Sequence, residues 1–208
     1  MQPQDRTELL RVIRDEVLAL ATPLALARKE GGTHPVIGEG SHFAKVMLIG
    51  EAPGRNEAAT GRPFVGAAGK MLDTLLASVE IPRSDVYITN IVKDRPPFNR
   101  DPLPDEIAAY GPFLDRQITI IQPAVIVTLG RYAMGYVMEK FGLADQLKPI
   151  SALHGTVQSA QAAYGPITIV PLYHPAVAVY NAATKDTLVA DMQILRQFDL
   201  KPAVSSGD

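Results

Sequence analysis

The sequence of 208 residues contains no cysteine. A chain without thiols forms no disulfide and no thiolate zinc site, cannot hold a cysteine-ligated iron–sulfur cluster, and has no thiol nucleophile. We therefore expect no cofactor, and we assign no metal site.

Long apolar runs are also missing. None approaches the roughly 20 residues that are needed to cross a bilayer. The first 27 residues carry acidic side chains throughout and lack the basic stretch followed by an apolar run that is typical of a signal peptide. We expect a cytoplasmic protein that does not associate with membranes.

An excess of positive charge is absent as well, because the net charge is -2 and the pI is about 6.1. Any contact with nucleic acid must then come from a local basic face. Two short segments are candidates, one with Arg55 and Arg62 and one with Lys93, Arg95 and Arg100. The alternative interpretation is that these are ordinary solvated charges.

The apolar content of 47% suffices for a sizeable core at this length. We expect one domain over residues 1–199, a disordered tail over 200–208, and a monomer.

Short, continuous apolar runs of the kind that form buried parallel strands lie at 45–50, 86–92, 124–130 and 167–172. Helical patterns lie at 7–21, 67–79, 104–121, 131–141 and 184–198, and Gly111-Pro112 is expected to bend or split the third of these. The alternation predicts an α/β fold, a three-layer α/β/α sandwich around a mostly parallel four-stranded sheet.

In such a sheet the ligand lies at the carboxyl ends of the strands. The polar residues expected to meet there are Glu51, Asn90, Arg131 and His174. A lone histidine is more often structural than catalytic, but this one follows the fourth strand directly and precedes a proline.

The segment after the first strand, residues 50–66, contains four glycines and two prolines. Such a loop allows close backbone approach to a ligand. A phosphate-binding turn is the alternative. Neither G-x-G-x-x-G nor G-x-x-x-x-G-K-[ST] is present, and the Glu51 carboxylate would repel phosphate.

Five motifs occur in order along the chain: GEAPG, TGRPFVG, VYITNIVK with RPP, NR and PLPDE, then LG and HPA. Together they resemble the iron–sulfur (family 4) uracil-DNA glycosylases over about residues 23–198. The resemblance implies a three-layer domain that flips uracil out of single- or double-stranded DNA and hydrolyses its glycosidic bond without a lyase step. The protein would be a monofunctional glycosylase of base excision repair.

The same resemblance implies roles for particular residues. Phe64 would stack on uracil, and Asn90 would read its Watson–Crick edge. His174 would stabilise the uracil anion at O2, while Glu51 would position water or stabilise the cationic sugar. The backbone N–H of Ala52 would also contact the base.

Further residues are implied at the rim. Glu57 would bar the methyl group of thymine at the C5 edge, although a solvated surface carboxylate is the alternative. Val179 and Tyr180 would replace the family's Leu and Arg in the wedge that fills the gap left by the flipped base. The DNA-binding arginines would be Arg55, Arg62, Arg95 and Arg100.

The four cysteines that hold the family's cluster are replaced by Ala19, Thr22, Asp94 and Tyr110. We expect these residues to lie close together. A buried Asp94 carboxylate would need hydrogen bonds from the Tyr110 hydroxyl, from Thr22 or from backbone N–H groups.

Three other functions stay open at this point. One is a glycosylase for a broader range of deaminated bases, such as hypoxanthine. Another is a protein that binds uracil-containing or damaged DNA without catalysis, and a third is a protein that binds small nucleotides. The combination of Glu51, Asn90 and His174 favours the enzyme, because a binding protein needs no acid to position water.

Overall fold

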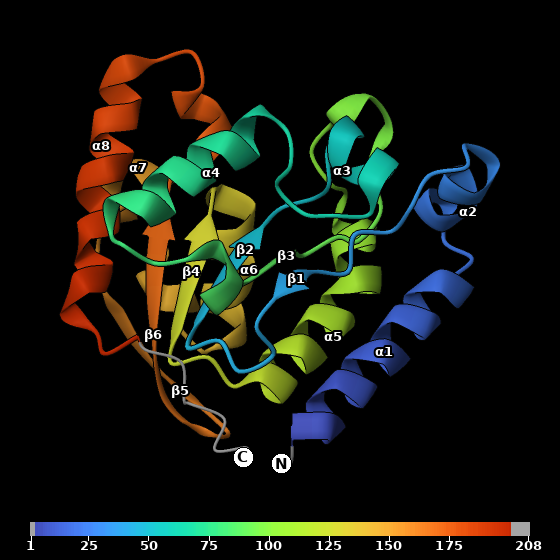
Figure 1. Cartoon of the computed structure of the whole chain (residues 1–208), viewed down its shortest axis with the longest axis horizontal. Coiled ribbons are helices and arrows are strands. Elements are labelled where there is room, and N and C mark those ends of the chain that lie inside the picture. The colour runs from blue at the N-terminus through green and yellow to red at the C-terminus, as the bar shows by residue number, and fades with distance from the viewer. Residues whose placement is uncertain (1–2, 201–208) are drawn as a thin grey trace.

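The computed structural model describes residues 3–200, which build one sheet with helices on both faces (Figure 1). The strand order is β1-β3-β2-β4-β6-β5. The four predicted strands are parallel neighbours at its centre: β3 (Tyr87–Asn90), β2 (Val46–Gly50), β4 (Val125–Leu129) and β6 (Gly165–Leu172). The predicted α/β class and parallel centre are confirmed.

The predicted count of four strands is wrong, because two antiparallel strands extend the sheet to six. β1 (Glu39–Gly40) pairs with β3, and β5 (Gln158–Ala162) pairs with β6. Neither is an apolar run. β1 is two residues long, and β5 reads QSAQA because an edge strand is only partly covered.

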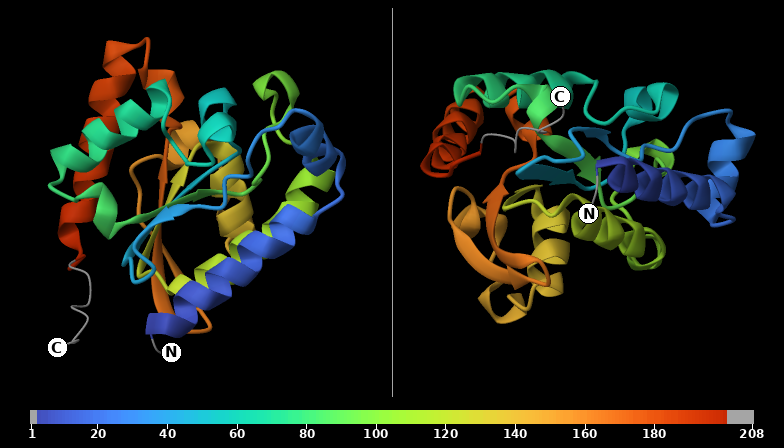
Figure 2. Two further views of the ribbon diagram at one scale, coloured as in Figure 1. Left: turned by 45° about the vertical axis from the view of Figure 1, so that its right-hand side comes forward. Right: turned by 60° about the horizontal axis from the view of Figure 1, so that its bottom comes forward.

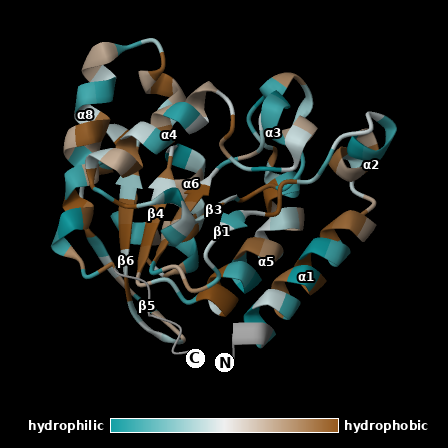
Figure 3. Cartoon of the chain, in the orientation of Figure 1, coloured by the Kyte–Doolittle hydropathy of each residue, from teal (hydrophilic) through white to brown (hydrophobic). Residues whose placement is uncertain are grey.

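The central strands are buried on both faces, which explains their continuous apolar sequences. On β2, Met47 and Ile49 join a core with α1 (Pro3–Ala19), α5 (Pro104–Ile121) and α6 (Arg131–Lys140). Val46 and Leu48 join the opposite core with α4 (Ala67–Ser78) and α8 (Ala182–Met192). Figure 2 shows the two helix layers on either side of the sheet, and Figure 3 shows the apolar strands between them.

The five predicted helices are present, the last as α8 followed by a 3₁₀ turn at Gln193–Gln197. Of the predicted bend or split at Gly111-Pro112, the split is wrong, because α5 runs through Pro112 without interruption. Packing against α1 and α6 holds this stretch, and the Tyr136 ring of α6 lies directly against Gly111. Three short helices were not predicted: α2 (Pro23–Glu30), α3 (Arg55–Thr60) and α7 (Ile150–Leu153).

Leu200 packs against the core beside α4 and α8. The predicted tail lies, from residue 201 onward, outside the described residues. Within residues 3–200, no helix is both long and apolar enough to cross a membrane.

Candidate active site

A pocket of about 420 Å³ opens at the carboxyl ends of β2 and β3, beside the segment that follows β6. The six side chains or backbone groups predicted to handle the base all line it: Glu51, Ala52, Glu57, Phe64, Asn90 and His174. The topology causes this convergence, since parallel strands bring their carboxyl ends to one edge.

Strand register builds the pocket floor. Gly50 and Asn90 are paired across β2 and β3, and the Asn90 amide lies directly over Gly50. A Cβ on Gly50 would lie 2.3 Å from Asn90 Oδ1 and 2.8 Å from Phe64 Cζ. Glycine is therefore required there. Asn90 is 2% exposed, and its Oδ1 is buried without a hydrogen-bond partner among residues 3–200.

Phe64 is held in place by its backbone. Its φ of 49° lies in the left-handed region, which a residue with a Cβ adopts at a cost. Its carbonyl packs so closely on Gly69 of α4 that a Cβ there would lie 1.9 Å from Phe64 O. The ring lies 5.7 Å from that of His174, so the two rings share one wall.

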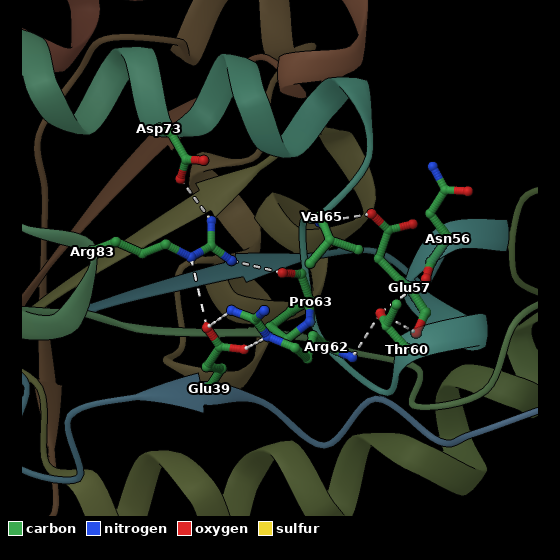
Figure 4. Close-up of polar contacts among 9 residues, drawn as sticks. All are labelled: Glu39, Asn56, Glu57, Thr60, Arg62, Pro63, Val65, Asp73 and Arg83. Atoms are coloured by element: carbon green, nitrogen blue, oxygen red, sulfur yellow. Dashed lines mark hydrogen bonds and ion pairs between the residues drawn. The ribbon is translucent and has the colours of Figure 1, made fainter.

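Glu57 is hydrogen-bonded to the loop that carries Phe64 (Figure 4). Its Oε1 accepts hydrogen bonds from the N–H groups of Val65 (2.9 Å) and Gly66 (2.8 Å). The alternative of a merely solvated carboxylate is therefore wrong, because one carboxylate oxygen satisfies two backbone donors. No local pattern predicts these bonds, which join α3 to the start of α4.

Arg83 supports the same loop from outside the pocket (Figure 4). It donates to the Pro63 carbonyl (2.7 Å) and to Asp73 of α4 (2.8 Å). Glu39 of β1 in turn accepts two hydrogen bonds from Arg62, at 2.6 and 2.8 Å. The unpredicted strand β1 thus anchors the loop through Arg62.

Burial gives Glu51 unusual electrostatics. Loss of solvent and the negative charge of Asp101 raise the pKa of Glu51 to about 7, although Arg131 opposes the shift. Near neutral pH this side chain therefore exists in both protonation states.

His174 is neutral and has a defined tautomer. Burial lowers the pKa of His174 to about 4, against an opposing effect of Glu57. Nδ1 accepts a hydrogen bond from the Ala176 N–H (3.2 Å), so the ring proton is on Nε2. The imidazole can therefore donate one hydrogen bond through Nε2–H.

Most of the predicted DNA-binding arginines already have partners. Arg62 binds Glu39, Arg95 donates to Asn99 (2.6 Å), and Arg100 binds Glu106 at 2.6 and 2.8 Å. Arg55 is exposed at the start of α3. Of these four, only Arg100 lines the pocket.

Lys93 does not belong to a basic face, which corrects the prediction. Its side chain is fully buried, and Nζ donates to Thr89 Oγ1, the Asn90 carbonyl and Gln117 Oε1 at 2.6–2.8 Å. Burial lowers the pKa of Lys93 to about 7. The prediction placed Lys93 on the surface, whereas residues 91–94, which follow β3 directly, are all buried.

The segment from Pro96 to Asp101 forms part of the wall and was missed as part of the base pocket. Asp101 accepts hydrogen bonds from Arg131 (2.6 Å) and from the Tyr132 hydroxyl (2.8 Å). Arg131, which was expected in the pocket, is thus held at its rim by Asp101. Nothing in the local sequence distinguishes Asp101 from other surface carboxylates.

The predicted wedge follows His174. Tyr180 is 94% exposed, whereas Val179 is partly buried. Tyr180 is therefore presented to solvent, four residues after Ala176 of the pocket wall.

The positions of the missing cysteines hold a buried hydrogen-bonded group. The Tyr110 hydroxyl donates to Asp94 (2.6 Å), as predicted, whereas Thr22 Oγ1 lies 3.0 Å from the Tyr110 hydroxyl and not against Asp94. Arg28 of α2, which was not predicted, donates to both Asp94 oxygens at 2.9 and 3.0 Å. Ala19 is exposed at the end of α1 and takes no part.

These residues do not fit an iron–sulfur cluster, because the irons require thiolate ligands. The site offers instead the ion pair of Arg28 with Asp94 and the phenol of Tyr110. Arg28 also donates to the carbonyls of Val17 and Leu18 at 3.3 and 3.0 Å. The group therefore joins α1, α2, α5 and the segment after β3. Within residues 3–200, no cluster of three or more His, Asp or Glu side chains is arranged to hold a metal ion.

Comparison with known proteins agrees with this geometry. The family model described as the uracil DNA glycosylase superfamily matches residues 37–195. The chain therefore belongs to the uracil DNA glycosylase superfamily.

Within that superfamily, the chain is similar to proteins named type-4 uracil-DNA glycosylase. The protein of Sulfurisphaera tokodaii is 44% identical over 82% of this chain and 77% of its own length. That of Archaeoglobus fulgidus is 42% identical over 77% and 80%. That of Thermotoga maritima is 40% identical over 86% and 88%.

Proposed function

We propose that this protein is a monofunctional uracil-DNA glycosylase that hydrolyses the N-glycosidic bond of uracil in DNA during base excision repair. Similarity to the type-4 enzymes over most of the chain supports this activity. The observation that carries the proposal is the buried Asn90 Oδ1, which has no partner within the described residues and lies at the floor of the pocket.

An unpartnered buried oxygen is costly, by about 1–3 kcal/mol, unless a ligand donates to it. Uracil offers the matching groups, because its N3–H donates to Oδ1 while its O4 accepts from the Asn90 amide. Cytosine has an acceptor at N3 and a donor at the 4-position, so both contacts would be unfavourable. Phe64 would stack on the base bound in this orientation.

Cleavage of the C1′–N1 bond leaves negative charge on uracil and positive charge on the sugar. His174 donates its Nε2–H to O2 of the departing anion, which a neutral imidazole can do. Ionised Glu51 positions the attacking water or stabilises the cationic sugar. Water supplies the hydroxyl group at C1′ and its proton leaves, so no lyase step and no cofactor are needed.

The finer assignments belong to the same proposal. The enzyme acts as a cytoplasmic monomer on uracil in either single-stranded or duplex DNA. Glu57 holds the Phe64 loop and, at the C5 edge, excludes thymine. Arg55 contacts the phosphate backbone directly, whereas Arg62, Arg95 and Arg100 exchange their present partners for phosphates.

An alkaline-cleavage assay on matched oligonucleotides tests the function. The substrates carry U:A, U:G, single-stranded U, T:G or hypoxanthine. We expect strand breaks at uracil only, and only after alkali, since a monofunctional enzyme leaves the abasic site intact. Absence of uracil-dependent breaks, or equal cleavage at T:G, would refute the proposal.

A further inference from the structure

Two aromatic rings near segments of the pocket wall stand almost fully in solvent. Phe98 is 97% exposed and Tyr180 is 94% exposed, whereas no other large apolar side chain in the described part of the chain exceeds 51%. Phe98 lies between Pro96 and Asn99, which line the pocket, and Tyr180 lies four residues after Ala176, which also lines it. Figure 1 shows these segments on two sides of the edge where the parallel strands end.

The backbone at Phe98 is unfavourable for phenylalanine. Its φ and ψ are 57° and 18°, and the φ of Asn99 is 55°, so two successive residues with side chains occupy the left-handed region. Glycine adopts this conformation without steric cost. No packing in the described part of the chain offsets this steric cost, since the Phe98 ring is not packed against either hydrophobic core.

The backbone of the loop that carries the ring is nevertheless constrained. Pro96 and Pro97 restrict the backbone, and the N–H groups of Asn99 and Arg100 donate back to their carbonyls at 3.1 Å. The Arg95 guanidinium bonds the Asn99 side chain, and Arg100 is fixed by Glu106. A preorganised aromatic surface loses little freedom when it binds a partner.

We propose that Phe98 is a stacking platform for the DNA base that neighbours the flipped uridine. This inference rests on the proposed function, because flipping removes one stacking partner from each neighbouring base. An exposed ring on a constrained loop of the pocket wall replaces that partner. Stacking on an aromatic ring tolerates any base sequence, as a repair enzyme requires. Tyr180 stands on the second loop, so the strand on both sides of the lesion meets an aromatic side chain.

Three variants of Phe98 separate stacking from folding. Phe98→Ala removes the ring and keeps the unfavourable backbone, Phe98→Gly removes both, and Phe98→Trp keeps a stacking ring. Leu9→Ala is the matched control, because it truncates an exposed apolar side chain on α1 that does not line the pocket. Thermal unfolding should show Phe98→Gly to be more stable than Phe98→Ala.

Binding is measured by fluorescence anisotropy on single-stranded oligonucleotides without uracil and on oligonucleotides with a non-cleavable uridine analogue. We expect both the glycine and the alanine variants to bind roughly tenfold more weakly. Tryptophan should restore binding, and Leu9→Ala should leave it unchanged. In single-turnover excision the glycine variant should need more enzyme for half-saturation but reach the wild-type maximal rate.

A 2-aminopurine next to the uridine analogue reports stacking directly, because its fluorescence is quenched on an aromatic ring. Quenching that is present in wild type and in Phe98→Trp but lost in Phe98→Gly supports the proposal. Unchanged affinity and unchanged fluorescence in Phe98→Gly overturn it. If wild-type protein does not excise uracil, the proposed function fails, whereas binding to uracil-free DNA still decides the role of Phe98.

Discussion

At the scale of single residues, Glu51 combines two opposing requirements. The mechanism uses its ionised form, while burial and Asp101 favour the protonated form and place its pKa at about 7. We therefore expect the enzyme to be partly inactive just below neutral pH. His174 does not contribute, because it stays neutral down to a pH of about 4. Lys93, which donates to the Asn90 carbonyl, also has a pKa of about 7 and titrates in the same range as Glu51.

We predict that kcat/KM for uracil excision rises as the pH increases through about 7 and then reaches a plateau. Asp101→Asn removes a negative charge and should move the midpoint to lower pH. A pH series of single-turnover rates under subsaturating conditions measures both. A flat profile between pH 5 and 9 would contradict the role given to ionised Glu51.

The same shift predicts a cost in stability. The unfolded Glu51 ionises near its ordinary pKa of 4.5, whereas the folded group ionises at about 7. The contribution of the neutral Glu51 side chain to the free energy of unfolding is fully present below pH 4.5. This contribution is lost as the pH rises to 7. Glu51→Gln should therefore raise Tm above pH 7 but not at pH 4. Equal Tm differences at both pH values would show that Glu51 titrates normally.

At the scale of structural elements, the sequence was informative wherever one local pattern determined one element. The runs at β2, β3, β4 and β6 are apolar on both faces because helices cover both faces. The edge strands β1 and β5 lack that cover and therefore lack the pattern. Helix α3 lies inside the glycine-rich loop and has only six residues, too few to show a helical period.

The buried group around Asp94 shows what sequence resemblance gives and what it omits. Replacement of the missing ligands by Asp94, Tyr110 and Thr22 was predicted by position, and their contacts are present. Arg28 was missed because nothing in the local sequence distinguishes it from other arginines, and only the fold shows that it faces Asp94. Its two hydrogen bonds make the group an ion pair that is nearly inaccessible to solvent.

We predict that Asp94→Ala lowers stability by about 3–5 kcal/mol, because it leaves the Arg28 charge buried and unpaired. Tyr110→Phe should cost about 1.5–3 kcal/mol, the contribution of a hydrogen bond to a charged group. Denaturant unfolding of both variants and of the double variant gives the coupling. The double variant should lose less than the sum, while single-turnover excision at saturation changes little.

Strict additivity of the two losses would contradict this account. The control is Asp94→Ala combined with Arg28→Met, which removes both charges. It should be more stable than Asp94→Ala alone, since no unpaired charge is left.

At the scale of the whole molecule, the layered α/β fold positions the side chains of the pocket. Parallel strands place Glu51, Asn90 and His174 at one edge, and this convergence followed from strand order alone. The remaining wall did not, because Pro96–Asp101 has no strand or long helix to place it. Its contribution depends on long-range contacts such as Arg131 with Asp101, which no local pattern encodes.

Release of free uracil in single-turnover reactions tests the central claim most directly. It is measured by mass spectrometry for wild type and for Glu51→Ala, Asn90→Ala and His174→Ala, each with its folding checked by circular dichroism. We predict that wild type releases one uracil per lesion, and that each folded variant is slower by roughly a hundredfold or more. No release by wild type, or near wild-type rates in all three variants, would contradict the account.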